Sequence, residues 1–216
     1  MQEYETIVNR IKKEVSEYYK NNFFSGHEYS HSLRVYNLCK ILAKNEKVDM
    51  LVLEAAALLH DIGREHERKD PKVDHAEKSA ELAQKILDKI GFPKEKVQDV
   101  LYAIKVHRFS KGINPKTLEA KILQDADRID VSGAIGIATA FAYGGAYGLK
   151  LYDIDDPFAK NRPLNDQKYC LDHFFTKLLK LDKTLNTKKG KMLAKKRKRF
   201  MIKFLKEFQE ELNNKK

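Results

Sequence analysis

Hydrophobic residues recur at helical spacing, every three or four positions, along most of this chain. No alternating run of Val, Ile or Thr is long enough to predict a sheet, and no internal repeat is present. The chain is therefore expected to be all-α, a helical bundle with a C-terminal helical pair. The pattern predicts helices over about 7–18, 31–45, 49–60, 74–91, 93–107, 117–142, 166–181 and 188–212.

Residues that favour helix ends stand where several of these patterns begin or stop. Asp49 and Asp74 can cap the third and fourth helices at their N-termini. Gly63 and Gly91 follow those helices, where glycine commonly ends a helix. Pro93 suits the first turn of the fifth helix, because its missing N–H has no partner there in any case.

The stretch 144–165 interrupts the helical pattern with glycines, prolines and an acidic run over 153–156. Long irregular segments in compact domains are often lids or binding loops, and a plain surface excursion fits this stretch equally well. The expected organisation is one domain, 1–216. Its parts are a core at about 23–142, the lid-like loop at 144–165 and C-terminal helices at 166–213.

The composition, 42% hydrophobic and 34% charged, is that of a globular protein. No apolar run approaches the roughly 20 residues that span a bilayer, and the N-terminus does not fit a signal peptide, so no membrane partner is expected. Cys39 and Cys170 are too few for a disulfide framework, which favours a reducing, cytoplasmic location. Oligomeric state is not indicated.

The net charge of +11 comes largely from lysines and arginines over 188–199. The first interpretation is the solvated face of a Lys-rich helix, and the second is a surface that attracts a phosphorylated substrate. Nucleic-acid binding comes third and is not favoured, because aromatic residues are not interleaved as stacking platforms.

The pair His60-Asp61 ends the apolar helical run 51–59. A buried imidazole beside a buried carboxylate is costly unless both have a partner, and a divalent metal ion accepts both. His31 before the pair and Asp127 after it complete a set of two nitrogen and two oxygen ligands. Such a mixed set suits Mn, Fe, Co, Ni, Zn or Mg and does not choose among them.

These residues, in this order, resemble the HD superfamily of metal-dependent phosphohydrolases, in particular its small stand-alone predicted hydrolases. The resemblance covers nearly the whole chain, and it implies an all-helical HD-domain bundle with a metal held by His31, His60, Asp61 and Asp127. It does not supply a substrate. The motifs are H-x-x-R-V at His31, H-D-I-G at His60, D-H-A-E-K-S-A at Asp74 and D-A-D-R-I-D at Asp125.

Three aspartates share the last motif. Asp127 and Asp130 lie three apart and so on one helical face. The resemblance gives the metal to Asp127, and Asp130 is expected to orient a ligand or to pair with an arginine. Asp125 points elsewhere and is expected to be an exposed carboxylate.

Two further histidines, His75 and His107, lie between the His-Asp pair and the last motif. In HD relatives with two metals, histidines in this interval bind the second ion. The alternative adopted for this chain places both beside a single ion, with one ion per chain favoured over two. There they would act in catalysis with Arg64, binding phosphate oxygen or protonating a leaving group.

Phosphate requires cationic partners, and Lys78 and Arg108 are the expected substrate-binding residues beside the histidines. Glu77 could order a water or a histidine, or be an ordinary exposed glutamate. The leading hypothesis is hydrolysis of a nucleotide or another small phosphoester by metal-activated water. The alternatives are an HD-fold diiron oxygenase, in which His75 and His107 both coordinate, and a non-catalytic nucleic-acid-binding module.

Overall fold

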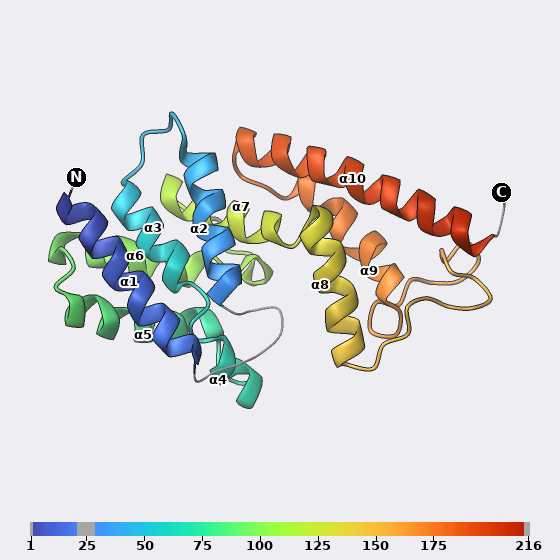
Figure 1. Ribbon diagram of the computed structural model, residues 1–216, viewed down its shortest axis with the longest axis horizontal. Helices are drawn as coiled ribbons and strands as arrows, with labels where there is room; N and C mark the ends of the chain where they lie inside the picture. The colour runs from blue at the N-terminus through green and yellow to red at the C-terminus, as the bar shows by residue number, and fades with distance from the viewer. Residues whose placement is uncertain (1, 21–28, 214–216) are drawn as a thin grey trace. The chain divides into compact units, whose positions relative to one another are not determined.

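The computed structural model describes residues 2–20 and 29–213, and it confirms the expected all-α fold (Figure 1). Within these residues the β structure is limited to one isolated bridge between Lys150 and Tyr169. The α-helices are α1 Gln2–Lys20, α2 Tyr29–Ala43, α3 Met50–Leu59, α4 Arg64–Lys69, α5 His75–Ile90, α6 Lys94–Val106, α7 Leu118–Asp130, α8 Gly133–Ala146, α9 Cys170–Thr176 and α10 Lys188–Leu212. Two 3₁₀ helices are η1 Phe109–Lys111 and η2 Leu178–Lys183.

The chain divides into two compact units, Met1–Asp127 and Arg128–Lys216. The division falls inside α7. Whether the two units form one domain, as the sequence predicts, stays a prediction. Each unit has its own hydrophobic interior and is described separately.

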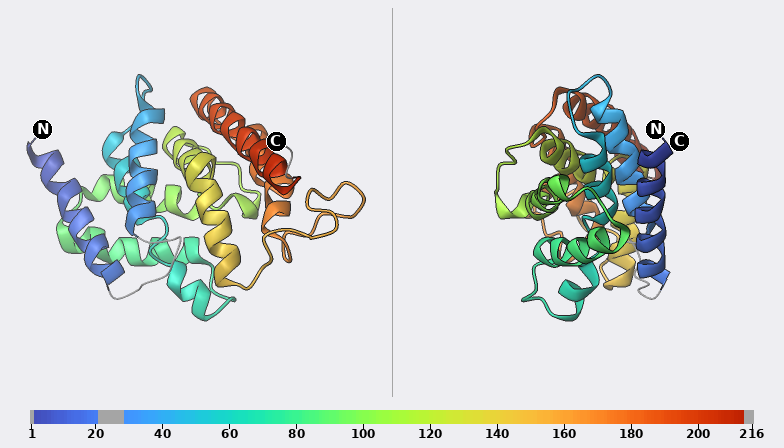
Figure 2. Two further views of the ribbon diagram at one scale, coloured as in Figure 1. Left: turned by 45° about the vertical axis from the view of Figure 1, so that its right-hand side comes forward. Right: turned by 90° about the vertical axis from the view of Figure 1, so that its left-hand side faces the viewer.

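Helix α3 occupies the middle of the first unit. Residues 51–59 are all buried, which is expected for a helix that is apolar at each of these positions except Glu54. Helices α1, α2 and α6 pack against it (Figures 1 and 2). Asp49 caps the helix as predicted, with its carboxylate accepting from the amides of Leu51 and Val52. The central position of α3 places His60 and Asp61, which follow it directly, in the interior of the unit.

The predicted ends of the next two helices agree closely with the structure. The Asp74 carboxylate accepts hydrogen bonds from the amides of Ala76 and Glu77 at the start of α5. Gly91 ends α5 in the left-handed conformation, with φ of 70°. Pro93 lies one residue before the first turn of α6 rather than within it.

The predicted helix over 117–142 is wrong, because the chain breaks between α7 and α8. Ser132 is extended and Gly133 has a φ of 70°. The Arg197 guanidinium donates to the Ile129 carbonyl at 2.6 Å and lies 3.4 Å from the Ser132 carbonyl. The first of these bonds reaches a carbonyl in the last turn of α7, where carbonyls have no helical amide four residues on to accept from.

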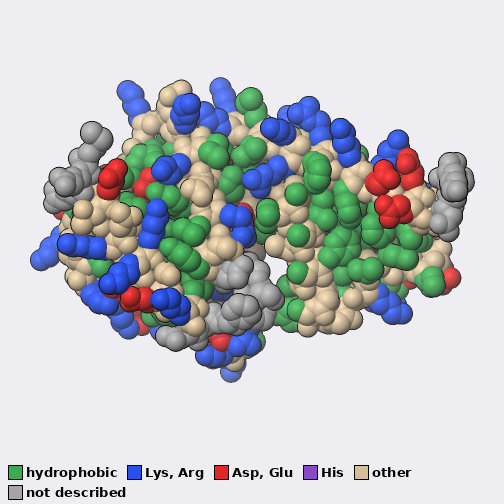
Figure 3. Space-filling model, viewed as in Figure 1, with side chains coloured by type: hydrophobic (Ala, Val, Ile, Leu, Met, Phe, Trp, Pro, Cys, Tyr) green, Lys and Arg blue, Asp and Glu red, His purple; other side chains and the backbone are tan. Residues whose placement is uncertain are grey.

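In the second unit, α8, α9, η2 and α10 surround a small aromatic-rich interior. The predicted helix over 166–181 is also wrong in extent. Only Cys170–Thr176 is α-helical, since Lys177, with φ of −131°, interrupts it before η2. Figure 3 shows Lys and Arg side chains along α10, beside an area where hydrophobic side chains gather. The buried residues of this interior are Leu171, Phe174, Leu178, Leu181, Met201 and Leu205.

The irregular segment begins at Tyr147, after α8 ends at Ala146, three residues later than predicted. Hydrogen bonds to Asp172 hold this segment against the start of α9. Arg162 donates from both terminal nitrogens to the fully buried Asp172 carboxylate, at 2.6 and 2.8 Å. The Asn165 amide donates to the same carboxylate at 2.6 Å. The lid-like behaviour expected of the segment 144–165 stays a prediction.

None of the described helices alone has the length and apolar composition needed to cross a membrane. Helices α7 and α8 pass that test only when taken together as a bent pair.

Candidate metal site

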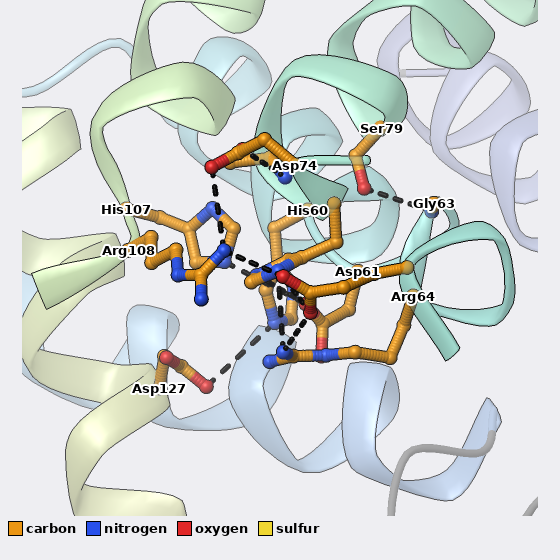
Figure 4. Close-up of polar contacts among 12 residues, drawn as sticks. His60, Asp61, Gly63, Arg64, Asp74, Ser79, His107, Arg108 and Asp127 are labelled. Atoms are coloured by element: carbon orange, nitrogen blue, oxygen red, sulfur yellow. Dashed lines mark hydrogen bonds and ion pairs between the residues drawn. The ribbon is translucent and has the colours of Figure 1, made fainter. Parts of the chain in front are cut away.

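His60 occupies the C-cap position of α3, one residue before Asp61. Its Nδ1 lies 2.8 Å from the Ala57 carbonyl, which can only accept, so Nδ1 carries the proton. In the neutral imidazole the Nε2 atom then offers a lone pair, as a metal ligand must. Figure 4 shows His60, Asp61, His107 and Asp127 pointing toward a common region.

His31, in the first turn of α2, and Asp127, near the end of α7, bring their polar atoms to His60. The His31 Nε2 atom lies 3.2 Å from His60 Nε2, 3.4 Å from Asp127 Oδ1 and 3.7 Å from Asp61 Oδ2. His60 Nε2 lies 3.8 Å from Asp127 Oδ1. Ligand atoms about 2.0–2.2 Å from one ion lie roughly 3.0–4.4 Å apart, depending on whether they occupy neighbouring or opposite positions, so these four distances fit a single ion. The four predicted ligands are thus brought together, and their binding of a metal stays a prediction.

The same four residues concentrate negative charge in a poorly hydrated place. His31, His60 and Asp61 are at most 1% exposed, and the Asp127 side chain is 24% exposed. Burial acts to raise the pKa of Asp127, but hydrogen bonds and charge interactions with His31 and His60 hold that pKa well below its ordinary value. A bound cation would likewise stabilise the charged form of these carboxylates.

A second group of donors shares Asp61. Its Oδ1 atom lies 3.5 Å from His75 Nε2 and 3.6 Å from His107 Nε2, and all three residues are buried. His107 repeats the arrangement of His60, because it occupies the C-cap of α6 and its Nδ1 lies 2.6 Å from the Ile104 carbonyl. Both groups could hold an ion, and the preference for one ion per chain stays a prediction.

His75 differs from the other two histidines in the partner of its Nδ1 atom, which lies 2.9 Å from Glu67 Oε2. Its Nε2 is buried and has no hydrogen-bond partner among the described residues. Burial is the main cause that lowers the pKa of His75 to about 4; Asp61 opposes this shift, and Arg64 and His107 add to it. A buried nitrogen with a free lone pair, facing Asp61, fits a site built to receive a cation or substrate.

Sequence reasoning missed Glu67. It lies in α4, whose six residues, R-E-H-E-R-K, contain no apolar residue and gave no periodic signal. The Arg64–Glu67 spacing of three was the signal available, and the structure shows that pair at 3.1 Å.

A close approach between Gly63 and α5 positions His75 against the His-Asp pair. The Gly63 amide donates to the Ser79 hydroxyl at 2.8 Å (Figure 4). A Cβ atom at Gly63 would lie only 2.6 Å from the His75 carbonyl oxygen and from the Ser79 amide nitrogen. Glycine is required here by space, whereas the sequence suggested only a helix stop.

The expected cationic residues are placed unequally. Arg64 lies at the site, with its Nε 3.4 Å from Asp61 Oδ2 and its side chain 30% exposed. Arg108 binds Glu67 at 2.6 Å and lies 3.3 Å from Asp74. Lys78 pairs instead with Glu81 at 2.7 Å.

The remaining carboxylates lie elsewhere. Glu77 is exposed, 3.6 Å from Lys105, and the structure does not bring it against the histidines. Asp130 is 2% exposed at the end of α7, and its expected role stays a prediction. The expectation that Asp125 is exposed is wrong: it is fully buried, because it lies on the side of α7 that faces the interior.

The comparisons with known proteins agree with this geometry. A family model described as the HD domain matches residues 29–132, which begin with α2 and end just after α7. Protein YpgQ of Bacillus subtilis is 33% identical over 192 residues, covering 87% of this chain and 85% of YpgQ. This chain belongs to the HD superfamily. At the level of the family it is an HD-superfamily hydrolase.

Solved structures cover nearly all of this chain. The crystal structure of an HD-superfamily hydrolase from Bacillus thuringiensis is 31% identical, has a TM-score of 0.77, and matches 98% of this chain and 100% of that one. The structure of B. subtilis YpgQ in complex with ADP is 28% identical, with a TM-score of 0.73 and 96% of both chains covered. Ribonuclease Y of Syntrophomonas wolfei is 35% identical over 104 residues, which are 47% of this chain and 18% of that protein.

Proposed function

We propose that this protein is a metal-dependent phosphohydrolase that cleaves a nucleotide or another small phosphoester with water. The observation that carries the proposal is the convergence of His31, His60, Asp61 and Asp127, whose donor atoms have the spacing of ligands around one ion. The ADP in the YpgQ structure supports a nucleotide as the ligand class.

His31, His60, Asp61 and Asp127 would hold the divalent ion. When bound, such an ion supplies a positive charge that polarises a phosphoryl oxygen and lowers the pKa of a coordinated water. Asp127 offers a carboxylate oxygen, and His60 offers an Nε2 lone pair when its proton resides on Nδ1, and a cation binds donors of both kinds.

Arg64 is the residue best placed to bind the phosphate. Its guanidinium is partly exposed and contacts Asp61 and Glu67, so it lies at the open side of a buried carboxylate. Arg108 and Lys78 pair with Glu67 and Glu81 and not with a proposed metal ligand, whereas Arg64 contacts Asp61 directly. Arg64 is therefore assigned the first contact with a phosphate oxygen.

The histidines are better suited to accept a proton than to donate one. His107 carries its proton on Nδ1, facing the Ile104 carbonyl, and its Nε2 faces Asp61. His75 has the same arrangement, with Glu67 in place of the carbonyl. An unprotonated Nε2 can take a proton from the attacking water. This assigns them the role of base instead of the leaving-group protonation that the sequence suggested.

The donor group Asp61, His75 and His107 keeps a second candidate open, a two-ion centre such as that of an HD-fold diiron oxygenase. Metal analysis of anaerobically purified protein separates the two. One ion per chain supports the hydrolase with a single ion, and two irons per chain support the oxygenase.

The direct test is a turnover assay with Mn, Co, Ni or Mg against a phosphomonoester, a phosphodiester and a set of nucleotides. Metal-dependent hydrolysis of at least one of these substrates by the wild type, lost in Asp61→Ala, is the expected result. Absence of turnover on every substrate, with metal bound in stoichiometric amount, would refute the proposal.

A further inference from the structure

Helix α4 contributes an acidic residue, Glu67, that contacts His75 directly. Among the described residues, Glu67 has no contact with His31, His60, Asp61 or Asp127, the proposed metal ligands. The Glu67 Oε2 atom lies 2.9 Å from His75 Nδ1. The Glu67 side chain is 20% exposed, and the His75 side chain is 1% exposed. An ionised carboxylate can only accept hydrogen bonds, so this contact requires the proton of a neutral imidazole to reside on Nδ1.

We propose that Glu67 is a positioning residue for His75: it holds the imidazole in the tautomer whose Nε2 lone pair faces Asp61 and His107. The inference rests on the proposed function for its catalytic meaning. The tautomer itself belongs to the resting protein and does not depend on turnover.

Two contacts compete with this assignment. Asp61 Oδ1 lies 3.5 Å from His75 Nε2, where a carboxylate would favour a proton, but it is farther away than Glu67 and forms no hydrogen bond with Nε2. Arg64 Nη1 lies 3.2 Å from His75 Nδ1, and a guanidinium can only donate, which would require an unprotonated Nδ1. Nδ1 cannot satisfy both neighbours. The distance to Glu67 is shorter, and the same Arg64 nitrogen lies 3.1 Å from Glu67 Oε2, which gives its hydrogen an acceptor. Glu67 therefore decides the tautomer, and Arg64 reinforces the carboxylate.

Both oxygens of Glu67 are held in place by arginines. Arg108 donates to Oε1 at 2.6 Å, and Arg64 donates to Oε2 at 3.1 Å. Partial burial acts to raise the pKa of Glu67, but the interactions with His75, Arg64 and Arg108 outweigh it and hold that pKa below its ordinary value. The carboxylate is thus ionised and fixed in orientation. Arg108, expected from the sequence to bind substrate, is placed here to position Glu67.

The two other histidines show what the site requires. His60 and His107 direct Nδ1 at backbone carbonyls, so their Nε2 lone pairs face the donor groups. His75 is the first residue of α5, where no preceding helical carbonyl is available to accept from its ring. A side-chain carboxylate from α4 supplies the missing acceptor.

The experiment is nitrogen-15 NMR of the histidine rings in the full-length, chelator-treated protein at neutral pH, with the His75 signals assigned by their absence in His75→Gln. The wild type is expected to show a protonated Nδ1 and an unprotonated Nε2 for His75. Glu67→Ala is expected to shift the population toward the opposite tautomer, and Glu67→Gln, which keeps an acceptor oxygen, to lie between the two.

The matched control is Glu65→Ala. Glu65 lies on the same short helix but pairs with Arg68 at 2.6 Å and Lys69 at 3.4 Å, and the His75 signals should not change. An unchanged His75 tautomer in both Glu67 variants would overturn the inference, as would a protonated Nε2 in the wild type.

Kinetics separate positioning from substrate binding. Glu67→Ala is expected to lower kcat about 10–100-fold, the usual range for a residue that orients a site histidine, with KM changed less than about threefold. Metal stoichiometry should stay at the wild-type value, because Glu67 is outside the primary ligand set. If no phosphoester is turned over, the proposed function fails while the NMR result still decides the role of Glu67.

Discussion

Gly63 lies so close to α5 that Gly63→Ala should change the stability of the protein. Crowding against α5 and the entropy of the unfolded backbone predict opposite signs for that change. Gly63 has φ of −84° and ψ of −5°, which alanine adopts without strain. If the unfolded chain alone mattered, Gly63→Ala would therefore stabilise the protein by about 0.4–1 kcal/mol. The geometry predicts the opposite sign.

The added methyl group would lie 2.6 Å from two backbone atoms of α5, whereas ordinary contact begins at 3.4 Å. Helix α5 must therefore retreat by roughly 0.8 Å, since backbone atoms cannot turn aside as a flexible side chain can. Overpacking of this kind costs about 1–3 kcal/mol. The retreat also stretches the hydrogen bond from Gly63 to Ser79, which contributes about 0.5–1.5 kcal/mol.

The net destabilisation expected for Gly63→Ala is about 1–4 kcal/mol, or a fall in Tm of roughly 3–12 °C for a chain of this size. Thermal unfolding followed by circular dichroism measures it. Gly145→Ala is the control, because a Cβ at Gly145 would meet nothing within 4 Å, and it should leave Tm unchanged or slightly higher. A Gly63→Ala protein as stable as the wild type would refute the argument from close approach.

Three further predictions concern carboxylates. Saturating Mn²⁺ at about 100 times Kd should stabilise the wild type by about 2.7 kcal/mol, and Asp61→Ala should lose this effect together with bound metal; stoichiometric metal in the variant would contradict the ligand assignment. Asp172→Ala leaves Arg162 without its buried partner and should lower the free energy of unfolding, measured in urea, by about 3–5 kcal/mol. Asp155 is exposed, so Asp155→Ala should leave that free energy almost unchanged, and equal effects of the two substitutions would contradict the role of the Arg162 contact. Burial acts to raise the pKa of Asp74, but its helix-capping and lysine hydrogen bonds lower that pKa to about 2. The ionised carboxylate therefore stabilises the fold by about 2 kcal/mol above pH 4, and this contribution is lost as the pH falls through about 2. Asp74→Asn should be less stable than the wild type at pH 6 and equally stable at pH 2, and an equal difference in stability at both pH values would contradict this sign.

The parts of the fold that the sequence predicted well are those set by local pattern. Helix α3 combines a run that is apolar except at Glu54 with a capping aspartate, Asp49, and both signals lie in or next to the helix. The His60-Asp61 pair follows directly, so its burial was predictable as soon as the helix was. The convergence with His31 and Asp127 came from the resemblance to a known family, since spacing along the chain does not show which helices meet.

The parts that the sequence predicted poorly depend on contacts between distant residues. The break before α8 is stabilised by Arg197, which lies 65 residues beyond Ser132 in the chain. No local signal identifies such a partner. Glu67 was missed for a local reason. Helix α4 has six residues, all of them polar, so it has no hydrophobic periodicity from which a helix could be predicted.

The three site histidines also differ in how readily a mutation can remove the acceptor that holds the Nδ1 proton. His60 and His107 direct Nδ1 at main-chain carbonyls, which every amino acid possesses, so no single substitution at Ala57 or Ile104 deletes the acceptor. The acceptor for His75 is a side chain, and one codon change removes it. Among homologues that share this fold, divergence in the chemistry of the site is therefore more accessible at position 67 than at either helix end.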